Sequence, residues 1–359
     1  MSTPHIGIAG AGLAGRLLAW RLLRAGCRVS LFDSRARDDF SSASQTAAAM
    51  LSPLAELAVS DEAVFALGQR SMRLWPQWIA ELAEHGAAVY FRQAGTLVVA
   101  HPPDQASLQH FMQLLAHKLP ADCRAQVQTL DASELAEREP ALAGRFGGGL
   151  HLAGEGQLAN DQLLAALALE IDRLGGIWHE AQQVQQIDAH RIDCAAQSHT
   201  FDACVDARGV GSKTGLPGLR GVRGEVLRVQ CRGVQLRRPV RLMHPRYQLY
   251  VAPRPNDEFV VGATELESED EGPVTLRSML ELASALHSLH PAFGEARVLR
   301  MSAALRPAFD DHRPVVIERD GLWHINGLYR HGYLCAPALV EAAVKGLATA
   351  LANTLLEQS

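Results

Sequence analysis

The hydrophobic and polar positions of the first 34 residues predict a strand, a helix and a second strand. His5–Ala9 is a short apolar run, and from residue 13 to 25 leucines recur at helical spacing with arginines between them. Gly26 stands where the C-terminal cap of this helix belongs, and residues 27–33 again have the pattern of a strand. A βαβ unit is therefore expected at the start of the chain.

The pattern after this unit does not continue as a series of βαβ units. Residues 61–86 and 102–119 have the periodicity of helices, and residues 88–100 between them are typical of a hairpin. These segments predict an excursion into a second domain. The glycine-rich run that begins at Gly147 and the helical pattern over 160–175 predict the return to the first.

Strand patterns dominate the second half of the chain. Apolar and polar positions alternate over residues 221–265 as they do in antiparallel strands, with one strand expected over 247–254. A helical pattern over 274–289 and a strand over 298–305 follow, and residues 337–356 predict a closing helix.

The turn between the first strand and the helix has the spacing G-x-G-x-x-G, at Gly10, Gly12 and Gly15. These glycines allow a tight turn, the approach of a pyrophosphate and close packing of helix and strand, and the helix N-terminus attracts the phosphates. Asp33, eighteen residues after Gly15, is placed to accept hydrogen bonds from an adenosine ribose, which favours NAD or FAD over NADP. A glycine-rich turn in an empty βαβ unit is the alternative.

Two interpretations of the serine- and alanine-rich residues 41–53 stay open. Small side chains let the backbone approach a large flat ligand, whereas alanine also favours an ordinary helix start. A second turn from strand to glycine, at residues 206–212, is expected to hold the same nucleotide from another side.

Composition narrows the classes of function. The 359 residues are 48% hydrophobic, and the net charge of −5 includes no basic block, so nucleic acid is not an expected partner. None of the six cysteines forms C-x-x-C and none of the fifteen histidines forms H-x-x-x-H, so no metal site is expected. With no secretion signal and no apolar run of about 18 residues, a cytoplasmic protein without a membrane span is expected.

Five motifs follow one another along the chain: the Gly10–Gly15 turn, Ala47–Leu51, the paired runs Tyr250–Arg254 and Val261–Thr264, Leu305–Pro307, and Gly327–Leu334. Together they resemble the D-amino-acid oxidase superfamily of flavoproteins, and the bacterial glycine oxidases most of all. The resemblance covers nearly the whole chain. The glycine turn alone occurs in many flavin and nicotinamide enzymes, but the combination is much more specific.

This resemblance implies an α/β fold in which a Rossmann-type FAD-binding domain is interleaved with an α+β substrate domain built on an antiparallel sheet. FAD is expected to be held non-covalently, with the adenine at Val184. The implied FAD-binding residues are Gly10, Gly12, Leu13, Ala14, Gly15, Asp33, Ser34, Ala43, Ser44, Ala48, Ala49, Met50, Val184, Gly209, Leu328, Tyr329, Arg330, His331, Gly332, Tyr333 and Leu334. The FAD-binding domain would comprise residues 1–85, 147–220 and 307–359, and the substrate-binding domain residues 86–146 and 221–306.

The resemblance also implies three substrate-binding residues. Arg306 would bind its carboxylate, Tyr250 would add a hydroxyl, and Arg330 would line the pocket near the flavin. Arginine suits the first role because its planar fork binds a carboxylate bidentately and keeps its charge. Tyr250 could equally be a core aromatic residue, and the roles of Arg208 and Glu265 stay open.

The expected function is that of an FAD-dependent oxidoreductase acting on the C–N bond of a small amino acid or amine. Hydride transfer to flavin would give an imine and then an oxo acid and ammonia, with dioxygen as acceptor and hydrogen peroxide as product. One alternative is a dehydrogenase or demodifying oxidase of an N-substituted glycine or larger amine with another acceptor. A second is a non-catalytic flavin-binding protein, and an oligomer is compatible with each.

Overall fold

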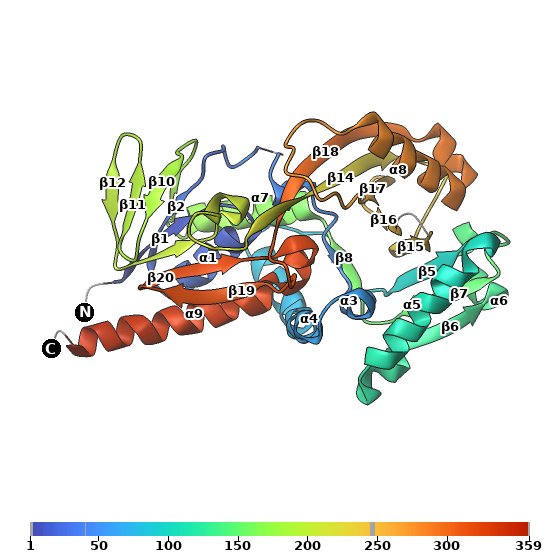
Figure 1. Ribbon diagram of the computed structural model, residues 1–359, viewed down its shortest axis with the longest axis horizontal. Coiled ribbons are helices and arrows are strands. Elements are labelled where there is room, and N and C mark those ends of the chain that lie inside the picture. Colours follow the sequence, from blue (N-terminus) through green and yellow to red (C-terminus); the bar gives the residue numbers. More distant parts are fainter. Residues whose placement is uncertain (1–2, 40, 245–247, 358–359) are drawn as a thin grey trace.

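A six-stranded sheet forms one end of the computed structural model, which describes residues 3–39, 41–244 and 248–357 (Figure 1). The strand order is β19, β20, β13, β1, β2, β9, and only β19 runs antiparallel to its neighbour. The strands are β1 (His5–Ala9), β2 (Arg28–Phe32), β9 (Ile177–His179), β13 (Ala203–Asp206), β19 (Val315–Arg319) and β20 (Leu322–Asn326). A smaller antiparallel sheet comprises β10 (Val184–Ile187), β11 (Arg191–Cys194) and β12 (Ser198–Thr200).

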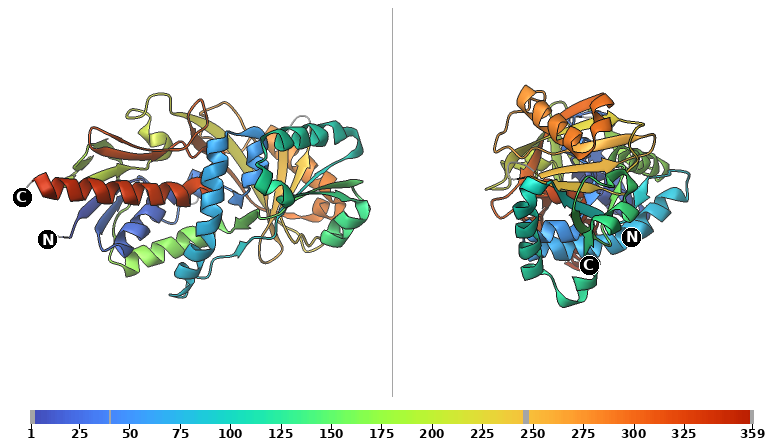
Figure 2. Two further views of the ribbon diagram at one scale, coloured as in Figure 1. Left: turned by 90° about the horizontal axis from the view of Figure 1, so that it is seen from below. Right: turned by 90° about the vertical axis from the view of Figure 1, so that its right-hand side faces the viewer.

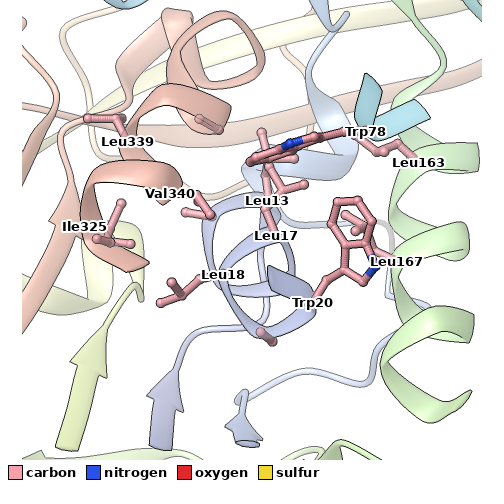
Figure 3. Packing of buried hydrophobic residues seen from close by; sticks show 14 of the residues in the cluster. Leu13, Leu17, Leu18, Trp20, Trp78, Leu163, Leu167, Ile325, Leu339 and Val340 are labelled. Atoms are coloured by element: carbon pink, nitrogen blue, oxygen red, sulfur yellow. The ribbon is translucent and has the colours of Figure 1, made fainter. Parts of the chain in front are cut away.

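The N-terminal βαβ unit forms as its apolar periodicity predicts. The helix α1 (Leu13–Arg24) buries nearly all of its apolar side chains, and Gly26 follows it with a φ of +87° that favours glycine. Figure 3 shows Leu17 and Trp20 of α1 between side chains of α7 (Asn160–Arg173) and α9 (Gly332–Glu357). The core of this half therefore joins segments from both ends of the chain.

The closing helix α9 begins at Gly332, five residues before the predicted start at Pro337. Proline has no N–H to donate to the carbonyl of Tyr333 one turn earlier, which usually ends or kinks a helix. Here the indole Nε1 of Trp75, on α4 (Glu62–Ala83), donates to the Tyr333 carbonyl oxygen at 2.9 Å. Figure 2 shows α4 crossing beside the N-terminal end of α9. This side-chain bond lets the helix continue through the proline.

An eight-stranded sheet forms the other half of the molecule, in the order β18, β14, β17, β16, β15, β5, β7, β6. All neighbours are antiparallel except β15 and β5. The strands are β5 (Thr96–Ala100), β6 (Val127–Asp131), β7 (Gly148–Leu152), β14 (Arg220–Gln230), β15 (Val240–Met243), β16 (Gln248–Pro253), β17 (Glu258–Gly262) and β18 (Arg297–Ala308). Tyr247, expected as the first residue of the β16 strand, lies outside the described residues.

Helices cover both faces of this sheet, and side chains of β5 point alternately to the two faces. Leu97 and Val99 pack in one cluster with α8 (Leu276–Leu289). Val98 and Ala100 pack in another with α3 (Pro53–Val59) and α5 (Gln105–Lys118). The two-residue period of a strand buried on both sides therefore builds two cores at once.

A third, three-stranded sheet consists of β3 (Met50–Leu51), β8 (Gly156–Leu158) and β4 (Phe91–Arg92). The remaining α-helices are α2 (Ala43–Thr46) and α6 (Ala132–Arg138). Short 3₁₀ segments complete the described chain: η1 (Pro102–Asp104), η2 (Ala121–Gln126), η3 (Pro140–Leu142), η4 (Gly209–Ser212), η5 (Pro291–Glu295) and η6 (Tyr329–His331).

Two sequence-based expectations about chain organisation are wrong. The predicted hairpin over 88–100 does not form, because β4 pairs with β8 whereas β5 pairs with β7 and β15. The glycine run at Gly147 does not return the chain to the six-stranded sheet. It opens β7 of the eight-stranded sheet, where a Cβ on Gly149 would overlap the carbonyl oxygen of Val98. Residues 147–152 and the helix α3 thus pack with the sheet that the prediction gave to the substrate domain.

The segment Tyr329–Ala352 is long and apolar enough to cross a membrane by length and composition. No apolar run of this kind was expected from the sequence. Half of its most apolar 18-residue window is buried inside the protein, against α1 and α4 among others. Part of this apolar surface therefore belongs to the core of the protein.

Candidate cofactor and substrate site

One cavity of about 1160 Å³ extends from the carboxyl ends of β1 and β2 to the eight-stranded sheet. Every predicted site residue except Gly15 lines it, including Arg306, Tyr250 and Arg330. Carboxyl ends of parallel strands are the usual ligand-binding edge of an open α/β sheet. We call the part of the cavity at the six-stranded sheet the nucleotide end and its part at the eight-stranded sheet the substrate end, after the ligands that the sequence predicts there.

The glycines at the nucleotide end are required by close contacts. Gly10 has a φ of +100°, and a Cβ there would overlap the carbonyl oxygen of Ala207. A Cβ on Gly15 would overlap the carbonyl oxygen of Gly10, so this glycine lets α1 pack against the turn although it does not reach the cavity. A Cβ on Gly12 would lie 3.1 Å from Ser44 Oγ. The turn thus exposes backbone where a phosphate group can approach.

Hydrogen bonds shape the same end around the N-terminus of α1. Leu13 N donates to Ser44 Oγ at 2.9 Å, and Asn160 holds the Ser44 loop by donating to the Gln45 carbonyl oxygen at 2.7 Å. Asp33 accepts from Ala11 N at 2.7 Å and from Arg35 N at 2.9 Å. The serine-rich stretch forms the short helix α2, as one earlier interpretation expected, and it also lines the cavity. Its approach to a large flat ligand stays a prediction.

Near Val184, the Arg208 side chain turns back onto Asp206. Its Nε and Nη2 donate to the two Asp206 carboxylate oxygens at 2.9 and 2.7 Å, and its Nη1 donates to the Val184 carbonyl oxygen at 3.3 Å. Burial opposes ionisation of Asp206, but Arg208 outweighs it and lowers the pKa of that carboxyl. Arg208 thus braces β13 and β10 against each other. Three residues that the sequence interpretation missed also line the cavity: Trp178 and His179 of β9, and Gln183 after that strand.

The middle of the cavity is lined by Ala48, Ala49 and Met50. Ala49 has a φ of +48°, in the left-handed region that favours glycine. The buried Arg254 donates to the Ala48 carbonyl oxygen and to Gln157 Oε1, and burial lowers its pKa to about 10. Arg254 was not predicted, although a charged residue at the end of an apolar strand is a usable signal.

Arg306 and Tyr250 meet at the substrate end because glycines on neighbouring strands make room for them. A Cβ on Gly224 of β14 would overlap the Arg306 guanidinium, and one on Gly262 of β17 would lie 2.6 Å from Tyr250 Oη. Arg306 Nη1 donates to the Thr264 carbonyl oxygen at 3.1 Å, and no carboxylate of the described chain lies within 4.0 Å of it. Burial raises the pKa of Tyr250, so its hydroxyl keeps its proton at neutral pH.

Arg330 is held between two carboxylates. Its Nε lies 3.0 Å from Glu56 Oε2, and its Nη1 lies 3.0 Å from Glu265 Oε2. Glu56 also lies 3.4 Å from Arg241 Nη2 and 3.2 Å from His331 Nδ1. Burial disfavours the Glu56 anion, but these partners outweigh it and lower the pKa of the carboxyl well below its usual range. The charge of Glu56 in turn raises the pKa of Arg330.

Glu56 was missed by the sequence interpretation. The available signal was an acid in the first turn of an otherwise apolar helix, α3. Arg330 lies just before the start of α9, where a cation is unfavourable unless an anion is near, and two protein carboxylates supply that anion. Within the described ranges, no group of three or more His, Cys, Asp or Glu side chains could hold a metal ion.

Comparisons with known proteins show the family of the chain. Residues 5–345 match the family described as "DAO: FAD dependent oxidoreductase". A Rhizobium etli protein described provisionally as thiamine biosynthesis oxidoreductase ThiO is 40% identical, over 95% of this chain and 96% of its own. Glycine oxidase of Geobacillus kaustophilus is 27% identical, over 92% and 89% of the two chains.

The solved structure of glycine oxidase from Geobacillus kaustophilus superposes with a TM-score of 0.81 at 26% identity, covering 95% of each chain. The fold prediction of an α/β flavoprotein is thereby confirmed, and so is the prediction of FAD as the cofactor. With its glycine turn, its long cavity and a family match over almost its whole length, the chain belongs to the DAO family of FAD dependent oxidoreductases.

Proposed function

We propose that this enzyme oxidises the C–N bond of a small amino acid or N-substituted glycine. The observation that carries the proposal is Arg306, a guanidinium without a carboxylate partner in the described chain, beside the Tyr250 hydroxyl at one end of the FAD cavity. A fixed cation of this kind suits a substrate carboxylate. The likeness to glycine oxidase supports the same class of substrate.

The residues of the chain bind and orient the substrate. Arg306 binds the carboxylate through its planar fork, and the protonated Tyr250 hydroxyl donates a further hydrogen bond. Bound FAD supplies the hydride acceptor. No histidine is needed as a base, because the amine loses its proton to solvent before it reacts. In the balanced overall reaction, an amino acid, dioxygen and water are converted to an oxo acid, ammonia and hydrogen peroxide.

The test is to mix the purified flavoprotein with glycine, sarcosine, D-amino acids or L-proline without oxygen and to follow the flavin absorbance. Bleaching by one compound, followed by peroxide on readmission of air, is the expected result. Bleaching without peroxide would leave amine oxidation standing but would require another acceptor. A flavin that stays yellow with every compound would overturn the proposal and favour a non-catalytic flavin protein.

The 40% identity to the Rhizobium etli protein also supports a role in thiamine biosynthesis. Deleting the gene should then make growth depend on added thiamine, and the dependence should disappear when the gene is restored. Growth of the deletion strain without thiamine would overturn the proposed role in thiamine biosynthesis. It would not bear on the proposed oxidation of a C–N bond.

Replacing Asp33 with alanine should weaken FAD binding about 10- to 100-fold. The carboxylate holds the glycine turn through Ala11 N and lines the cavity where the ribose is expected. Hydrogen bonds to a charged group contribute about 1.5 to 3 kcal/mol each. The measurement is the flavin content after gel filtration. The matched control is Asp38→Ala, an exposed acid five residues away that does not line the cavity. Full flavination of Asp33→Ala would count against this placement of the ribose.

A further inference from the structure

Two arginines of the substrate end, Arg306 and Arg330, differ in their freedom to bind an anion. Arg330 already contacts Glu56 and Glu265 at 3.0 Å each. Within the described parts of the chain, the Arg306 side chain makes one hydrogen bond, to the Thr264 carbonyl oxygen, and no carboxylate lies within 4.0 Å of it. The cavity therefore presents one guanidinium that can receive a carboxylate and a second whose charge is already compensated.

Of the two carboxylates that contact Arg330, Glu265 is the more exposed, at 44% against 11% for Glu56. Glu265 lines the cavity together with Arg306 and Arg330. Burial favours its neutral form, but Tyr329 and the two arginines outweigh this effect and lower its pKa, so Glu265 is an anion at neutral pH.

The backbone of Glu265 is fixed on both sides. Thr264 N donates to the Glu225 carbonyl oxygen at 3.2 Å, and Leu266 exchanges two backbone hydrogen bonds of 2.9 Å with Arg223. Glu225 and Arg223 belong to β14 and form a buried ion pair at 2.7 Å. The carboxylate therefore cannot leave Arg330 by a simple displacement of its loop.

We propose that Glu265 restricts this enzyme to amines with a single carboxylate. Arg306 Nη1 donates to the carbonyl oxygen of Thr264, the residue before Glu265, so a substrate held by Arg306 lies next to the Glu265 carboxylate. A second carboxylate on that substrate would be repelled, because like charges repel at short range. A neutral or cationic group at the same place meets no such penalty, and an amide N–H can donate to Glu265. The inference rests on the proposed function and names its substrate class.

The test compares iminodiacetate with its monoamide, N-(carbamoylmethyl)glycine, because the two differ in one charged group and little in shape. The wild-type enzyme should have a kcat/KM at least about tenfold higher for the monoamide, since each 1.4 kcal/mol of repulsion corresponds to a factor of ten. The variant Glu265→Gln removes the charge and frees the adjacent Arg330 nitrogen, so it should reverse the ratio or bring it close to one.

The matched control is Glu267→Gln. Glu267 is exposed two residues farther along the same loop, pairs with Arg220 at 3.4 Å and does not line the cavity. In this variant, the ratio of kcat/KM for the monoamide to kcat/KM for iminodiacetate should equal that of the wild-type enzyme. An unchanged ratio in Glu265→Gln, or a wild-type enzyme that oxidises both compounds equally well, would overturn the inference.

A binding measurement separates this inference from the proposed function. Diglycolate and its monoamide carry an ether oxygen instead of the amine, and their binding is followed through the visible spectrum of the flavin. Tighter wild-type binding of the monoamide, lost in Glu265→Gln, supports the inference even if no amine bleaches the flavin. Equal affinity of the two ligands overturns the inference alone, and binding of neither overturns both proposals.

Discussion

Replacing Arg306 with alanine is expected to lower kcat/KM by about 10²- to 10³-fold while FAD stays bound. Two charge-assisted hydrogen bonds to the substrate carboxylate would be lost, which together contribute about 3 to 4 kcal/mol. Arg306 lies at the end of the cavity away from the glycine turn, so the nucleotide contacts should be unaffected. Steady-state peroxide formation and the flavin absorbance of the purified variant measure the two effects separately.

Two further variants show whether the lower kcat/KM comes from the lost contact between Arg306 and the substrate carboxylate. Arg297→Ala removes an exposed arginine from the same strand, β18, and should retain wild-type kinetics. Arg306→Lys keeps the charge but loses the planar fork, and should lie between the wild-type enzyme and the alanine variant. Wild-type kinetics in Arg306→Ala would exclude this residue from the substrate site.

Replacing Gly15 with alanine is expected to abolish FAD retention and to lower the melting temperature by several degrees. The new methyl group would overlap the Gly10 carbonyl oxygen, so α1 must move away from the turn that it packs against. Overpacking of a tight contact costs about 3 kcal/mol at the upper end of the usual range. Flavin content and thermal unfolding of the purified variant are the measurements.

A glycine elsewhere in the chain provides the comparison for this variant. An added Cβ at Gly147 would meet no atom within 4 Å, and its φ is not in the left-handed region. The free energy of unfolding of Gly147→Ala should therefore lie within about 0.5 kcal/mol of the wild-type value, and the variant should keep its flavin. A Gly15→Ala protein with full flavin and unchanged melting would show that the helix can shift without cost.

Local patterns predicted the parts of the fold that depend on neighbouring residues. The N-terminal βαβ unit formed as expected, because glycine spacing, helical periodicity and the following strand all lie within 34 residues. The hairpin over 88–100 failed because both of its segments are strands but their partners lie far away in sequence. Strand pairing of this kind is decided by tertiary packing, which a local pattern does not contain.

The candidate site also has parts that local sequence patterns indicate and parts that they do not. The motif residues could be named from the sequence, since each carries its chemistry within a short run. The pair of Arg330 with Glu56 spans 274 residues, and no local pattern indicates it. The role of Arg208 stayed open in the sequence, although its partner Asp206 is only two residues away, because its second contact, the Val184 carbonyl oxygen, is distant in the chain.

The arrangement of the six-stranded sheet has a consequence for how the protein folds. β1 lies between β2 and β13, and the strands beyond β13 are β20 and β19. The helix α9, which packs on α1, follows β20 in the chain. The core beside the glycine turn is therefore complete only when segments from distant parts of the chain have come together. Non-local contacts of this kind require closure of long loops and slow the folding of the sheet.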